Sequence, residues 1–354
     1  KAEDLWEKTQ RIIGFFVSKQ NGLLIKELFC DDLRFLPETR SLWPIFQLLI
    51  QWPDLMNDNY RKIIAYYTLC LQLIGKSEEE IIKLISTINE INDLSDAVDE
   101  LDKFLIENNA QDNGNWFEKH LETELRKKDS MSLLDRNILL LYWILRMQEA
   151  RDFSYDANVT PEKRTEFGDS ELKINENCAP QKQHIIPFSK LTAIYDRDIK
   201  RTGTNEANNI GNITYISRIL NSYDYGLGDK FIDLEKEPEV NRAAHFLDEV
   251  INEYKELKNN FEKINELQEE QKNNLEDLYK KFCEKRREAI MNQWKKWLHD
   301  LKGKTNDERQ KIEEQKPILE DRIVVREFLE SKKGVKKIYE YFKRKREIIL
   351  PTYP

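Results

Sequence analysis

The sequence is poor in the residues that interrupt helices. Its 354 residues include only 11 glycines and 10 prolines, each about half the usual share. Sandwiches and barrels need such turn residues about every 8–12 positions, so their scarcity predicts a mainly α-helical chain. No run approaches 18 uncharged apolar residues and no secretory signal opens the chain, so we expect no membrane partner.

Cysteine is also scarce, and its spacing excludes two classes of site. Cys30, Cys70, Cys178 and Cys283 lie 40 or more residues apart, so none forms a CxxC zinc or redox pair. Isolated thiols are typical of the reducing cytoplasm, where we expect this chain to be.

Charge, in contrast, is abundant, and acidic residues predominate. The chain has 65 acidic and 57 basic residues, a net charge of −8, which taken alone argues against a nucleic acid partner. Residues 76–120 hold 12 of the acidic and 4 of the basic residues, which is −8 for this segment by itself. The rest of the chain is therefore nearly neutral, and a limited basic face for DNA is not excluded.

The composition changes along the chain and predicts four segments. Residues 1–150 read as an α-helical domain, in which Ser77 followed by three glutamates predicts a helix start. Residues 151–177 are polar and irregular, as in a linker. Residues 178–235 hold 4 of the 11 glycines and short β-type runs, and residues 236–354 read as a C-terminal helical domain.

The C-terminal domain has an apolar seam that repeats about every 3.5 residues. It begins at Leu247 and extends to Phe282. This pattern predicts a long coiled-coil-like helix or a helical hairpin, packed within the protein rather than used for oligomerisation. We expect the helix to break at 259–260 or at 272–274.

His184 is the histidine whose neighbours suggest chemistry; His120, His245 and His299 are expected to be surface or capping residues. The run His184-Ile185-Ile186-Pro187 predicts a strand that carries the imidazole at its tip and is ended by the proline.

Two asparagines downstream complete the motif. Asn212, in a turn with Gly211, can hydrogen-bond back across the loop, and a second short strand then leads towards a helix with Asn221. Phosphodiester cleavage needs a base, a cation and a fixed scaffold. His184 can be the base, Asn221 can give an oxygen to Mg²⁺, and Asn212 can hold the loop.

This order of residues resembles the HNH, or ββα-metal, nucleases. It most resembles the C-terminal part of GmrSD-like modification-dependent restriction and phage-defence proteins, and the stretch from Phe282 to Arg287 resembles the helix that follows their motif. The similar region covers about 55 residues, roughly a sixth of the chain. The resemblance implies a mainly α-helical fold with a small embedded ββα-metal (HNH) motif at 178–235.

The resemblance also implies a function. It implies a metal-dependent endonuclease that cleaves DNA, including modified phage DNA, with Mg²⁺ or Mn²⁺ as cofactor. His184 and Asn212 would be catalytic, and Asn221 with Gln183 would bind the metal. Lys190, Arg218 and Lys230 would contact the nucleic acid. The family further allows a homo-oligomer or a partner defence subunit, and implies a nucleotide-hydrolysing domain upstream of Lys1.

Gln183 departs from the family pattern, because HNH nucleases place an Asp, Glu or His immediately before the base. An amide oxygen binds Mg²⁺ more weakly than a carboxylate does. Either a nearby acid completes the site, or the metal binds weakly, or the site is inactive; the candidate acids are Asp196, Asp198, Asp224 and Asp229. Two alternatives to a nuclease stay open: an inactive HNH-like module that binds nucleic acid, and a helical scaffold for protein interactions.

Overall fold

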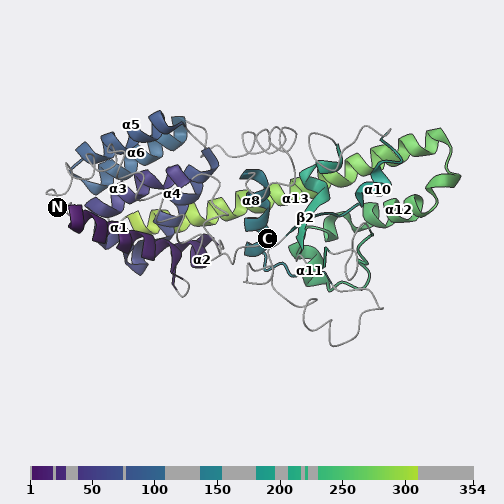
Figure 1. The fold of residues 1–354 in the computed structure, drawn as a ribbon, viewed down its shortest axis with the longest axis horizontal. Coiled ribbons are helices and arrows are strands. Elements are labelled where there is room, and N and C mark those ends of the chain that lie inside the picture. The colour runs from purple at the N-terminus through teal and green to yellow at the C-terminus, as the bar shows by residue number, and fades with distance from the viewer. Residues whose placement is uncertain are drawn as a thin grey trace. The chain divides into compact units, whose positions relative to one another are not determined.

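The computed structural model describes residues 2–18, 21–28, 39–74, 77–107, 136–153, 181–195, 206–216, 220–221 and 230–309. These residues are mainly helical and include one small two-stranded sheet (Figure 1), which confirms the prediction of a mainly α-helical chain. None of the described helices combines the length and the apolar character needed to cross a membrane.

The chain forms two compact units. The first comprises Lys1–Phe117 and Lys295–Pro354, and the second comprises Glu118–Trp294. The second unit thus includes the helix at 136–147, which the sequence assigns to the N-terminal domain. The expected domain ends at 150, 177 and 235 stay a prediction.

The first unit is a group of helices that pack on one another (Figure 1). Its helices are α1 (Ala2–Val17), α2 (Leu23–Leu28), α3 (Trp43–Gln51), α4 (Arg61–Ile74), α5 (Glu78–Glu90) and α6 (Leu94–Glu107), with short turns η2 (Thr39–Leu42), η3 (Pro53–Met56) and η4 (Asp58–Tyr60). Helix α3 contacts α1 and α5, and α4 contacts α2 and α6. Ser77 caps α5 in a capping box with Glu80, as the sequence predicts.

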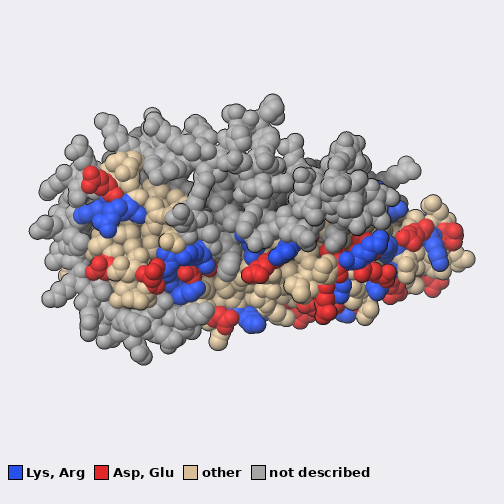
Figure 2. All heavy atoms as spheres, turned by 90° about the horizontal axis from the view of Figure 1, so that it is seen from below, with Lys and Arg blue, Asp and Glu red and all other residues tan. Residues whose placement is uncertain are grey.

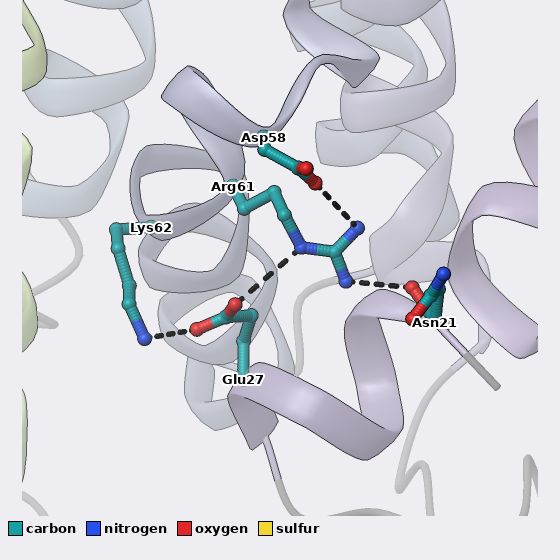
Figure 3. Close-up of polar contacts among 5 residues, drawn as sticks. All are labelled: Asn21, Glu27, Asp58, Arg61 and Lys62. Carbon is teal, nitrogen blue, oxygen red and sulfur yellow. Dashed lines mark hydrogen bonds and ion pairs between the residues drawn. The ribbon is translucent and has the colours of Figure 1, made fainter.

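An ionic cluster around the largely buried pair Arg61 and Glu27 joins α2 to α4 (Figure 3). Arg61 donates from Nε to Glu27 Oε1 at 3.4 Å and from Nη2 to the Asn21 carbonyl at 2.8 Å. Its Nη1 lies 3.8 Å from Asp58, and Lys62 also pairs with Glu27. Because each buried charge has an opposite charge beside it, the cluster avoids the cost of an unpaired ion and ties the two helices together.

The second unit packs helices around the small sheet. Its elements are α8 (Arg136–Met147), β1 (Gln181–His184), α10 (Phe188–Leu191), η5 (Glu206–Asn208), η6 (Ile210–Asn212), β2 (Ile213–Ile216), α11 (Glu239–Ala244), η7 (Asp248–Val250), α12 (Ile251–Glu262), η8 (Ile264–Glu266) and α13 (Glu269–Arg309), whose residues up to Trp294 belong to this unit. One apolar core joins Ile216 of β2 and Ile185, just after β1, with Tyr254 of α12 and Phe282 of α13.

The apolar seam forms a helical hairpin. Its members Val250, Leu257 and Leu275 lie in the same core, so the seam packs within the unit. The helix breaks at 263–268, between α12 and α13, and not at either of the two places expected from the asparagines. Those asparagines lie inside helices, because the apolar contacts on either side outweigh their weak preference for turns.

The beginning of the expected linker is part of this core. Phe153 is fully buried and its ring lies 4.3 Å from that of His245. Asn241 accepts a hydrogen bond from the Arg151 backbone amide at 2.9 Å and donates to the Asp152 carbonyl at 3.3 Å. Residues 151–153 are therefore a packed segment, while 154–177 lie outside the described residues.

Candidate nuclease site

The two strands form an antiparallel ladder that ends at His184. Gln181 lies opposite Ile216, and His184 lies opposite Ile213 at the other end. The chain then turns through Pro187 into α10. The imidazole is thus at the end of the first strand, beside the loop that precedes the second strand.

Asn212 connects the loop after His184 to the turn before β2. Its backbone carbonyl accepts from Ile185 N at 2.8 Å, and its side-chain Oδ1 accepts from Ile186 N at 2.7 Å. Its Nδ2 donates to the carbonyls of Ile186 at 3.2 Å and Ala207 at 3.1 Å. This amide is fully buried, so breaking the bonds would leave unpaired polar groups in the core.

Asn208 holds the imidazole of His184. The His184 Nε2 atom lies 2.9 Å from Asn208 Oδ1, and Asn208 is itself buried. Because an amide oxygen only accepts, the proton of the neutral imidazole is on Nε2 and the basic lone pair is on Nδ1. The sequence reasoning missed Asn208; its place four residues before Asn212, in the same loop, is the signal that could have found it.

The two predicted metal ligands have other surroundings. Successive side chains of a strand point to opposite faces, so Gln183 points away from the face of His184, and it is only 8% exposed. Asn221 lies in a turn and donates to Gln181 Oε1 at 2.9 Å, at the start of β1 and not at its end. The described contacts therefore do not support Gln183 and Asn221 as ligands beside His184.

The described residues do not fit Mg²⁺ on their own. No group of three or more His, Cys, Asp or Glu side chains in the described part of the chain could hold a metal ion. The side chain bonded to His184, Asn208, is a neutral amide, whereas Mg²⁺ is bound mainly through carboxylates and phosphates. The candidate acids at 196, 198, 224 and 229 lie outside the described residues.

The predicted nucleic-acid contacts are described in part. Lys190 is half-buried in α10 and Lys230 is exposed, while Arg218 lies outside the described residues. On the face shown in Figure 2, Lys and Arg side chains lie among Asp and Glu. In the second unit Lys281 and Lys285 both pair with Glu253, so these basic residues of α13 are partly neutralised.

Helix α13 supports the turn that carries Asn212. Gly211 packs on the α13 backbone at Cys283, and Arg286, one turn later, is fully buried. Its guanidinium donates from Nη1 to three carbonyls around this turn, those of Ile210, Gly211 and Ile213. The sequence marks this stretch as similar to a family helix but gives no role to Arg286.

Among the other histidines, His299 is exposed on α13, as expected, and His120 lies outside the described residues. His245 is the C-cap of α11, which confirms the capping alternative, and it is fully buried rather than on the surface.

No family model, curated protein or solved structure is similar to this chain.

Proposed function

We propose that the second unit is an HNH-type endonuclease module that hydrolyses DNA phosphodiester bonds, with His184 as general base. The observation that carries the proposal is the hydrogen bond between His184 Nε2 and Asn208 Oδ1. A base must have its lone pair aimed at the proton it removes, and this bond sets both the tautomer and the direction of the ring.

The proposed reaction is an attack of water on phosphorus. His184 Nδ1 takes a proton from the water, whose oxygen forms the new P–O bond while the bond to the 3′ oxygen breaks. The 3′ oxygen leaves with a proton from solvent. Asn208 keeps the ring in place, and Asn212 keeps the strand end and the adjoining loop together.

The requirement for a metal is inferred from the resemblance to HNH nucleases. A divalent cation would neutralise charge on the phosphorane; the described His, Cys, Asp and Glu side chains form no group that could hold one. DNA as substrate also comes from the resemblance, with Lys190 and Lys230 as basic groups beside the motif. A role in defence against phage is part of the same proposal.

Plasmid cleavage tests the proposal. The full chain is incubated with supercoiled plasmid in Mg²⁺ or Mn²⁺, and we expect nicked or linear product. His184→Ala should lower the rate by about 100-fold or more, because general base catalysis contributes about 10²–10⁴. His299→Gln, a change at an exposed histidine, is the matched control. Equal cleavage by His184→Ala and the control would refute the mechanism.

A second candidate is a catalytically inactive module that binds nucleic acid. The position of Gln183 favours it, because a buried amide on the opposite face of β1 replaces the usual metal ligand. DNA binding and plasmid cleavage by the wild type separate the two: cleavage removes this candidate, and binding without cleavage in Mg²⁺ or Mn²⁺ supports it. A helical scaffold, the third reading, predicts unchanged biological activity in His184→Ala.

A further inference from the structure

The turn that carries Asn212 lies directly against α13. A Cβ atom on Gly211 would be 2.2 Å from the carbonyl oxygen of Cys283 and 2.6 Å from its Cα. Both of these are backbone atoms of a helix, which cannot move aside as a flexible side chain can. The turn therefore approaches the helix closely enough that only glycine fits, and its position depends on this helix.

Arg286 lies one helical turn after Cys283 in α13 and binds the same loop, the one that carries Gly211 and Asn212. Its Nη1 donates to the carbonyl oxygens of Ile210 at 3.1 Å, Gly211 at 3.1 Å and Ile213 at 2.8 Å. Its Nε donates to the His245 carbonyl at 3.0 Å. One rigid, planar side chain thus connects the turn before β2 to the end of α11.

Stability alone is a poor explanation of this arginine. It is fully buried and has no ion-pair partner among the described residues, and its Nη2 has no hydrogen-bond partner there either. A buried charge of this kind costs more than an apolar side chain of similar size. Desolvation lowers the pKa of Arg286 to about 9, so the side chain still carries its charge at neutral pH. What the guanidinium adds is a fixed geometry for several carbonyl groups at once.

A short series of contacts leads from Arg286 to the catalytic ring. The turn it binds ends at Asn212, whose amide holds the Ile186 and Ala207 backbones. Ala207 precedes Asn208, which holds His184. We propose that Arg286 is a positioning residue: it fixes the Asn208–Asn212 loop so that His184 keeps the tautomer and ring direction of a general base. This inference rests on the proposed function.

Arg286→Lys is the variant for the test, because it keeps the charge and the helix but cannot reach all four carbonyls. Arg287→Met is a control at the neighbouring position of the same helix. If Arg286→Lys melts below the assay temperature, Arg286→Gln, which removes the buried charge, is measured in its place. Selective ¹⁵N labelling of the four histidines reports the tautomer of His184, assigned with His184→Gln. Plasmid cleavage gives kcat and KM.

We expect the wild type to hold His184 in the Nε2–H tautomer and the Arg286 variant to shift it towards Nδ1–H. In the variant kcat should fall about 10- to 100-fold, since small misplacements of catalytic groups cost that much, while KM changes less than about threefold. A variant that only melts earlier, with wild-type tautomer and kcat, would overturn the inference. If the wild type does not cleave DNA, the proposed function fails, but the tautomer measurement still decides the role of Arg286.

Discussion

His245 makes the stability of the second unit depend on pH. Its ring is fully buried against Phe153, its Nε2 lies 2.7 Å from the Arg151 carbonyl, and its Nδ1 lies 2.7 Å from Thr214 Oγ1. A carbonyl only accepts, so Nε2 carries the proton and Nδ1 accepts from the threonine hydroxyl. Both ring nitrogens are used by the neutral form, and a second proton on Nδ1 would have to displace the hydrogen that Thr214 Oγ1 donates to it.

The size of the effect follows from the pKa. Burial lowers the pKa of His245 from 6.5 to about 3; the charge of Arg286 lowers it further, and the Arg151 carbonyl opposes the shift. Between these values the unfolded chain binds a proton that the folded chain does not, so stability falls as the pH drops below 6.5. At pH 5, protonation of His245 in the unfolded chain shifts the folding equilibrium towards the unfolded state by a factor of about 30. This lowers the free energy of unfolding by about 2 kcal/mol.

Urea denaturation at pH 7 and pH 5 measures this difference. Carboxylates also titrate in this range, so the quantity of interest is the loss of unfolding free energy in the wild type minus the loss in His245→Gln. We expect the wild type to lose about 2 kcal/mol more, because glutamine can hydrogen-bond but does not titrate. Hydrogen exchange of residues 239–247 identifies the transition of this unit, and His299→Gln should behave as the wild type. Equal losses in the wild type and His245→Gln would refute the reasoning.

Two further predictions concern single residues. Ser77→Ala should lower the unfolding free energy of the first unit by about 1 kcal/mol, because it removes the cap shared with Glu80; urea denaturation with no change would contradict the capping role. Gly211→Ala should cost about 1–3 kcal/mol, because its Cβ overlaps the backbone of Cys283, whereas Gly14→Ala, with nothing within 4 Å, should stabilise α1. Equal melting temperatures for the two alanine variants would show that the Gly211 turn can move.

The local sequence pattern predicted those elements of the fold that are determined by residues close together in the sequence. Few glycines and prolines predicted helices, and the serine-glutamate signal predicted the start of α5 at Glu78. Two short runs predicted two strands. β2 (Ile213–Ile216) lies within the second run, whereas β1 (Gln181–His184) ends at His184, so the rest of the first run, Ile185–Pro187, follows the strand. For the helices and the cap of α5 the deciding interaction lies within a few residues, which is the range over which sequence reasoning works.

Long-range contacts explain why the sequence did not predict the positions of His245 and Arg286. His245 has its partners Arg151 and Thr214 at separations of 94 and 31 residues, and Arg286 binds carbonyls 73–76 residues away. Both residues are polar and lie in or beside helices, so the local sequence pattern predicts that they lie on the surface. The packed turn before β2 shows why Arg286 is buried, since the carbonyl groups of Ile210, Gly211 and Ile213 need donors that the short sheet does not supply.

Gln183 lies next to His184 in sequence, and its role as a metal ligand stays a prediction. The resemblance pairs it with His184 because the two are neighbours, but the pleat of β1 sends neighbours to opposite faces. Asn208, 24 residues away, is the group that reaches the imidazole. The chemistry of the site therefore depends first on the loop between Asn208 and Asn212, and this loop depends on α13. In the proposed nuclease, a metal-binding residue would come from a segment that approaches the His184 face of the strand.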